Sequence, residues 1–299
     1  MDDHRPGEMR HIWYVPADDR ARLETAAGSA AHGLNLDLED GVLPARKAAA
    51  RTNIVALLEG RPELARRAVV RINDIGSAEW EQDVESIFGV THTILVPMLR
   101  ALDDLRRLED VLVRLEEAHG VAVGSKRLYL VVETAWLVAN LRETLAASQR
   151  IRGLIVGQAD LTVDLGCEGI SEDGGFVPSA SVEWSHGAIV CAAAERRIPA
   201  FISPWAPNHD RAYRVREARR LFALGYQGMV IGSAEAVEDV DAAWRPSPAQ
   251  AEFARLVLRG AAETKERGYG VAVCDGWATE APHVEIARRV LRRVGGEAS

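Results

Sequence analysis

Residues 34–40 read Leu-Asn-Leu-Asp-Leu-Glu-Asp, a short and largely apolar run that ends in carboxylates. It is one of eight such runs, and longer segments with helical periodicity alternate with them. The runs span Ile12–Pro16, Leu34–Leu38, Ala68–Ile72, Thr93–Pro97, Leu128–Val132, Gly153–Gly157, Pro199–Ile202 and Gly228–Ile231. Short apolar runs of this kind are typical of parallel strands buried on both faces.

The segments between the runs are amphipathic and predict helices. They include Ala45–Leu58, Leu102–Glu117, Leu137–Ala147, Val182–Glu195 and Arg211–Leu224. Asp18 is placed to begin the first helix, and Gly225 to end the helix at Arg211–Leu224. Eight such units predict an α/β (β/α)₈ TIM barrel. A doubly wound open sheet is the alternative, but it requires a glycine-rich turn after the first strand, and residues 15–19 contain no glycine.

The pattern changes after Trp244, so we expect a catalytic barrel at residues 1–244 and a C-terminal arm at residues 245–299. Ser247 or Pro248 is placed to begin a helix that runs to about Gly268. An apolar run, Tyr269–Cys274, a polar turn at Asp275 and a basic final helix follow. A segment this small suits a lid, or an arm that packs on a neighbouring subunit.

Composition limits the partners. The chain of 299 residues has 36 Lys+Arg against 44 Asp+Glu, a net charge of −8, which argues against nucleic acid or an anionic membrane as the main partner. Cys167, Cys191 and Cys274 are far apart in sequence and predict neither a disulfide framework nor a zinc site. With no apolar leader near residue 1 and no membrane-length apolar run, we expect a cytoplasmic protein.

Carboxylates gather where the predicted strands end. The second run continues into Asp37, Glu39 and Asp40, the fifth into Glu133, and the sixth into Asp160. The third run ends in Arg71 and Asp74. In a barrel these ends share one rim, where crowded acids repel one another unless a cation is present. We therefore predict a site for a hard divalent cation such as Mg²⁺.

Each residue also has a structural explanation. The acids at 37–40 could be loop or helix-capping residues, Glu133 could begin the next helix, and Arg71 could form a structural salt bridge. His92 and His186 favour structural roles, and Trp136 and Trp205 are either packing or pocket residues. The chain lacks the G-x-S-x-G, P-loop and H-E-x-x-H motifs.

The ordered set of motifs resembles the HpcH/HpaI aldolase and citrate lyase β-subunit family, as a divergent member. The matching motifs are Tyr14-Val15-Pro16, Leu36–Asp40 with Val42, Pro44, Lys47 and Arg51, Val70–Asn73, Val132–Ala135, and Gly157 with Asp160-Leu161 and Asp164–Gly166. In the tail, Pro246-Ser247-Pro248 and Asp275-Gly276 followed by Ala281-Pro282-His283 resemble the acyl-CoA lyase branch.

The resemblance implies a carbon–carbon lyase that depends on Mg²⁺, or on Mn²⁺ as an alternative, and acts through an enolate and a 2-oxo acid. It implies Glu133 and Asp160 as metal ligands, and Glu39 and Asp40 as partners of metal-bound water. Arg71, Gly157 and Asp160 would bind substrate. The catalytic residues would be Arg71 and Asp275, the latter as an acid/base from a neighbouring subunit. Lys47 and Arg22 would contact phosphate. The active enzyme would be a homotrimer or hexamer.

Departures from the family pattern lie on the outer rim. Met98, Met229, Ser233 and Ala234 stand where basic or His-Pro residues are usual. We therefore expect weak binding of coenzyme A, which the resemblance implies as the carrier of the acyl substrate. A thioester hydrolase on the same scaffold, or a lapsed barrel acting as a binding subunit, are the alternative functions.

Overall fold

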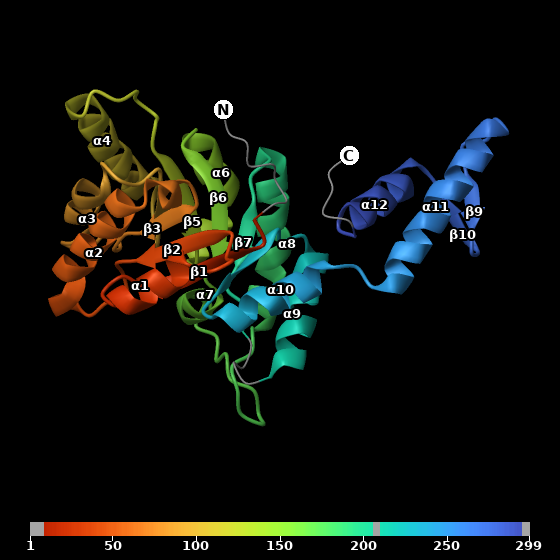
Figure 1. Ribbon diagram of the computed structural model, residues 1–299, viewed down its shortest axis with the longest axis horizontal. Coiled ribbons are helices and arrows are strands. Elements are labelled where there is room, and N and C mark those ends of the chain that lie inside the picture. The colour runs from red at the N-terminus through yellow and green to blue at the C-terminus, as the bar shows by residue number, and fades with distance from the viewer. Residues whose placement is uncertain (1–8, 206–209, 295–299) are drawn as a thin grey trace. The chain divides into compact units, whose positions relative to one another are not determined.

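Eight parallel strands close into a barrel, because the last strand returns to pair with the first (Figure 1). The computed structural model describes residues 9–205 and 210–294. The barrel strands are β1 His11–Pro16, β2 Gly33–Asp37, β3 Ala68–Arg71, β4 Thr93–Val96, β5 Arg127–Val132, β6 Ile151–Val156, β7 Ala200–Ile202 and β8 Gly228–Ile231. Ile12 pairs with Gly33 on one side and with Val230 on the other, so β1 has no free edge. The predicted barrel is confirmed, and the open-sheet alternative is wrong.

Helices follow every strand and cover the outside of the barrel (Figure 1). They are α1 Arg20–Ala27, α2 Lys47–Gly60, α3 Trp80–Ile87, α4 Leu102–Ala118, α5 Ala135–Ala139, α6 Leu141–Ala147, α7 Gln158–Asp164, α8 Ala180–Arg196, α9 Arg211–Leu224 and α10 Ala234–Trp244, with 3₁₀ turns at Pro44–Arg46 and Pro62–Arg66. The cap of α1 is Asp19 and not the predicted Asp18, since the Asp19 side chain accepts the Arg22 amide. Gly225 ends α9 with φ 112°, as predicted.

The barrel interior is apolar below its mouth. One cluster of buried side chains fills it: Ile12, Val69, Leu95, Val131, Ile155 and Phe201. These positions alternate along their strands with residues that face the outer helices. The barrel is therefore a packed core with room for a ligand only near the ends of its strands.

A buried ion pair joins α4 to the residue just before β6. Arg150 donates from Nη1 and Nη2 to the two carboxylate oxygens of Glu116, each at 2.7 Å. The Glu116 side chain is fully buried, and the amides of Gly124 and Lys126 also donate to it. Burial alone would raise the pKa of Glu116, but these hydrogen bonds lower it to about 2.

The chain divides into two compact units, Met1–Val240 and Asp241–Ser299, so the boundary lies a few residues before the predicted one at Trp244. The second unit contains α11 Pro248–Glu266, β9 Ala272–Cys274, β10 Trp277–Thr279 and α12 Ala281–Arg292. Ser247 caps α11 in a capping box with Gln250. All three cysteines are free, and no helix in the described ranges is long and apolar enough to cross a membrane.

Replacing Glu116 by Gln should destabilise the protein by about 3 kcal/mol, because it removes the buried counter-charge of Arg150 and leaves only Glu109, 3.8 Å from its Nε. In the wild type, the stabilisation from Glu116 is complete above the ordinary glutamate pKa of 4.5 and is lost as the pH falls towards about 2. Urea denaturation between pH 2.5 and 7 measures both effects. Glu195→Gln removes the exposed Arg142–Glu195 pair and should change stability little. Equal effects of the two variants would contradict this role for Glu116.

Candidate active site

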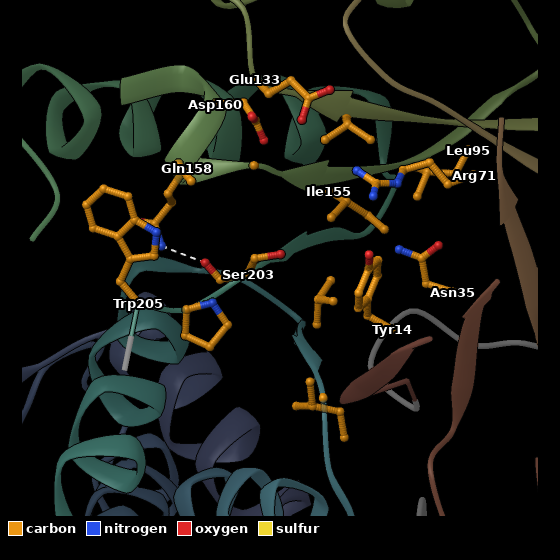
Figure 2. A pocket seen from close by; sticks show the side chains of 17 residues that line it. Tyr14, Asn35, Arg71, Leu95, Glu133, Ile155, Gln158, Asp160, Ser203 and Trp205 are labelled. Atoms are coloured by element: carbon orange, nitrogen blue, oxygen red, sulfur yellow. Dashed lines mark hydrogen bonds between the residues drawn. The ribbon is translucent and has the colours of Figure 1, made fainter. Parts of the chain in front are cut away.

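A cavity of about 330 Å³ opens at the ends of the barrel strands, where the βα loops begin. Figure 2 shows Glu133 and Asp160 on one side of it and Arg71, Tyr14 and Asn35 grouped on another. Trp205 also lines the cavity, whereas Trp136 does not. The site thus lies at the end of the barrel where TIM-barrel enzymes place their chemistry.

Arg71, at the end of β3, is held by the neighbouring strand. Its Nε donates to Asp37 Oδ1 at 2.6 Å, and its Nη1 lies 2.7 Å from Glu39 Oε2. Tyr14 donates its hydroxyl to the other Asp37 oxygen at 2.8 Å. No hydrogen bond joins Nη2 of Arg71 to another described residue. That edge of the guanidinium therefore remains available to a ligand.

Asp37 also shapes the loop that follows β2. Its carboxylate accepts the amides of Glu39 at 2.9 Å and Gly41 at 3.0 Å. Burial would raise the pKa of Asp37, but the Arg71 cation and these donors hold it below its usual value. Asp37 is thus an anion that fixes Arg71 and the loop together, a role that sequence reasoning did not assign to it.

Glu39 is buried against Arg71 and does not line the cavity, and Asp40 is exposed. Burial raises the pKa of Glu39 to about 8, with the charge of Glu133 adding to the effect and Arg71 opposing it.

Glu133 follows β5 and is almost fully buried. Its Oε1 accepts the Met98 amide at 2.7 Å, and Met98 has the left-handed φ of 50°. Thr134, not Glu133, caps α5 by accepting the Leu137 amide, so the helix-start explanation of Glu133 is wrong. Burial raises the pKa of Glu133 to about 7, and the Asp160 charge contributes.

Gly157 and Asp160, which follow β6, both lie next to Glu133. Gly157 precedes α7, and a Cβ on it would lie 2.6 Å from Glu133 Oε2. Asp160, in the first turn of α7, is half-buried and lines the cavity beside Glu133. Only glycine at position 157 leaves room for the Glu133 carboxylate.

The four acids of the site form two pairs, and only the first pair has a cationic partner among the described residues. Asp37 and Glu39 are paired with Arg71, so a metal ion is not needed to neutralise them. In the described part of the chain, no Lys, Arg or His forms an ion pair with Glu133 or Asp160, and no group of three or more His, Cys, Asp or Glu could hold a metal. Two carboxylates beside open space suit Mg²⁺, which keeps waters and substrate oxygens among its ligands, better than Zn²⁺.

Lys47 and Arg22 do not line the cavity. Lys47 donates from Nζ to the carbonyls of Leu38 at 2.9 Å and Glu39 at 3.2 Å and to the Asn73 side chain. An ammonium has three N–H groups, so this arrangement leaves none for the predicted phosphate contact. Arg22 lies at the surface, 3.2 Å from Asp19.

Gln158 lines the cavity near Asp160, and the sequence analysis did not predict it as a site residue. Its Nε2 donates to the Ser203 carbonyl at 2.7 Å. Its Oε1 is buried and has no hydrogen-bond partner among the described residues. A polar residue after a strand-end glycine was the one signal in the sequence that could have indicated it.

The family model for HpcH/HpaI aldolase/citrate lyase matches residues 10–234, which include the whole barrel. The chain belongs to this family. Known members are similar to it over nearly their full length.

Among these members are a citrate lyase subunit beta from Leuconostoc mesenteroides subsp. cremoris and a (3S)-malyl-CoA thioesterase from Cereibacter sphaeroides strain KD131. The first is 25% identical, over 95% of this chain and 92% of its own. The second is 28% identical, over 97% of this chain and 96% of the thioesterase. The crystal structure of protein CitE from Mycobacterium tuberculosis with magnesium, acetoacetate and coenzyme A has a TM-score of 0.79 and 27% identity, covering 96% of this chain and 98% of CitE.

Gly157→Ala should push the Glu133 carboxylate from its place, because the new Cβ would overlap Glu133 Oε2. We expect a loss of about 1–3 kcal/mol in the free energy of unfolding, measured by thermal denaturation. The matched control is Gly187→Ala on α8, where a Cβ meets nothing within 4 Å and should stabilise the helix slightly. A crystal structure of Gly157→Ala with Glu133 in its original position would contradict the prediction.

Proposed function

We propose that this family member is a Mg²⁺-dependent carbon–carbon lyase that cleaves or forms a β-hydroxyacyl (thio)ester or β-hydroxy acid. The observation that carries the proposal is the facing arrangement in one cavity of two carboxylates without a cationic partner, Glu133 and Asp160, and the partly free guanidinium of Arg71. The magnesium and acetoacetate bound by CitE support the same assignment.

Glu133 and Asp160 would hold the metal ion. Glu39 and Asp40 do not line the cavity, but both lie near enough to Glu133 for their charges to act on one another, and they would order the waters of the ion. The open oxygen of Glu133 lies beside Gly157, and both acids are hard oxygen donors, so the residues fit Mg²⁺. A bound Mg²⁺ would withdraw electron density from the carbonyl oxygen of a 2-oxo acid.

Arg71 would hold the carboxylate of the 2-oxo acid through its free Nη2. Because Asp37 and Tyr14 fix the guanidinium before substrate arrives, little reorganisation is needed. Cleavage breaks the bond between the carbinol carbon and the α-carbon of the acyl group. The carbinol loses its proton to become the 2-oxo acid, and the acyl α-carbon gains a proton.

A thioester hydrolase is the second candidate, because a (3S)-malyl-CoA thioesterase is 28% identical over nearly the whole chain. The coenzyme A site would differ from that of other members. Met229 is fully buried, and Ser233 accepts the Ala236 amide at 3.3 Å.

Malyl-CoA or citryl-CoA with Mg²⁺ should release a 2-oxo acid, and EDTA should abolish this activity. Glu133→Gln should reduce turnover at least about 100-fold without loss of thermal stability, because it removes a charged metal ligand. Glu143→Gln, an exposed acid on α6, is the matched control and should retain full activity. The 2-oxo acid is measured as its hydrazone and the thiol with a chromogenic disulfide.

The products separate the candidates. Thiol together with a free hydroxy acid, and no 2-oxo acid, would establish the hydrolase instead. No turnover with these substrates and no Mg²⁺-dependent stabilisation would contradict both enzymes and favour a binding subunit.

Asp275 is our candidate for the residue that handles the acyl proton. It lies exposed at the tip of the β9–β10 hairpin, where Asp275 and Gly276 have φ of 48° and 79°, as in a type I′ turn. A projecting turn residue suits a side chain that enters the site of another subunit. The proposal therefore requires an oligomer, for which we propose a trimer or a hexamer.

Asp275→Asn should remove most turnover while leaving Mg²⁺ binding intact. Mixing it with Glu133→Gln should restore part of the activity, because hybrid oligomers contain sites with both functional residues. Subunit exchange is verified with differently tagged chains before the assay. A mixture that stays inactive after exchange, or a monomer by light scattering, would refute a shared site.

A further inference from the structure

Asn35 places an amide inside the barrel, directly below the charged residues of the site. It pairs with Tyr14 on β1 and Val69 on β3 and lies two residues before Asp37. Alternate residues of a strand face the same side, so Asn35 points into the barrel one layer deeper than Asp37. It lines the cavity, and Figure 2 shows it beside Tyr14 and beneath Arg71.

The surroundings of Asn35 are mainly apolar. The other strands contribute Leu95, Val131, Ile155 and Val230 to the same cavity wall. Asn35 is 4% exposed, and its Oδ1 is buried without a hydrogen-bond partner among the described residues. Such a group costs about 1–3 kcal/mol of stability, which a valine or leucine at this strand position would not. The fold therefore gives no reason for an amide here.

The charges of the cavity limit what the amide can bind. Among the described residues that line the cavity, Arg71 is the only cation, and it already faces Asp37 and Glu39. A second carboxylate this deep would have no counter-charge, so we expect the dicarboxylic 2-oxo acid released from citryl-CoA to bind less well than one with a neutral substituent. A hydroxyl group is neutral, and it can both accept from the Asn35 Nδ2 and donate to its Oδ1.

We infer that Asn35 is a specificity-determining residue that recognises a neutral hydroxyl on the substituent of the bound 2-oxo acid. This inference rests on the proposed function, which places the carboxylate of that acid on Arg71. We place the substituent in the deeper layer, where Asn35 lines the cavity beneath Arg71 and offers both a donor and an acceptor.

Hydroxypyruvate and 2-oxobutyrate provide a direct test, since they have the same size and differ only in a hydroxyl against a methyl group. With Mg²⁺ present, the wild type should bind hydroxypyruvate at least about 10-fold more tightly by calorimetry. Asn35→Leu should bring the ratio of the two dissociation constants to about one or reverse it. It should also raise the melting temperature, because it removes an unpartnered buried polar group.

Ile155→Val is the matched control, as it changes the volume of the same cavity wall without changing its polarity. It should leave the ratio of the two dissociation constants as in the wild type. If Asn35→Leu does not fold, Asn35→Val, with a residue common in buried strands, replaces it.

The outcomes distinguish this inference from the proposed function. Equal ratios in the wild type and the Asn35 variant, with both acids bound in an Mg²⁺-dependent manner, would overturn the role of Asn35 and leave the lyase proposal standing. Failure of pyruvate, hydroxypyruvate and 2-oxobutyrate all to bind would overturn both.

Discussion

The burial of the Arg71 guanidinium is the constraint on which the rest of the site depends. A cation in the wall of an apolar barrel loses several kcal/mol of hydration, and this loss must be offset by close anions. Asp37 supplies the anion, and Glu39, on the other side of Leu38, contacts the guanidinium at 2.7 Å. The loop after β2 must therefore take a fixed course.

A second set of charged residues, none of which lines the cavity, fixes the course of the loop after β2. Lys47 binds the backbone carbonyls of Leu38 and Glu39 and the side chain of Asn73. Asn73 in turn donates to buried Asp83, which Arg51 neutralises at 2.7 Å. A continuous series of hydrogen bonds therefore joins the loop that holds Arg71 to helices α2 and α3.

Much of this architecture follows from the sequence, because strands buried on both faces are apolar without interruption. The eight runs therefore predicted the strands to within a few residues, and the acids at their ends predicted the rim. Contacts between side chains of different helices, strands and loops could not be predicted from the sequence in the same way. Nothing in the spacing between Lys47 and Leu38 indicates that the lysine turns back onto its own loop. Asn35 stands in an apolar run, and its inward orientation depends on the register with Tyr14, which the sequence does not specify.

The described residues of the barrel supply binding groups but no free group for proton transfer. Burial raises the pKa of Tyr14, whose hydroxyl already donates to Asp37, so Tyr14 is a poor base at neutral pH. Glu39 is occupied by Arg71, and Glu133 and Asp160 are the proposed metal ligands. A lyase must nevertheless deliver a proton to the acyl carbon, and the described residues of the cavity leave that role unfilled. This unfilled role is the reason for proposing Asp275, an exposed acid of the C-terminal unit, as the group that another subunit supplies.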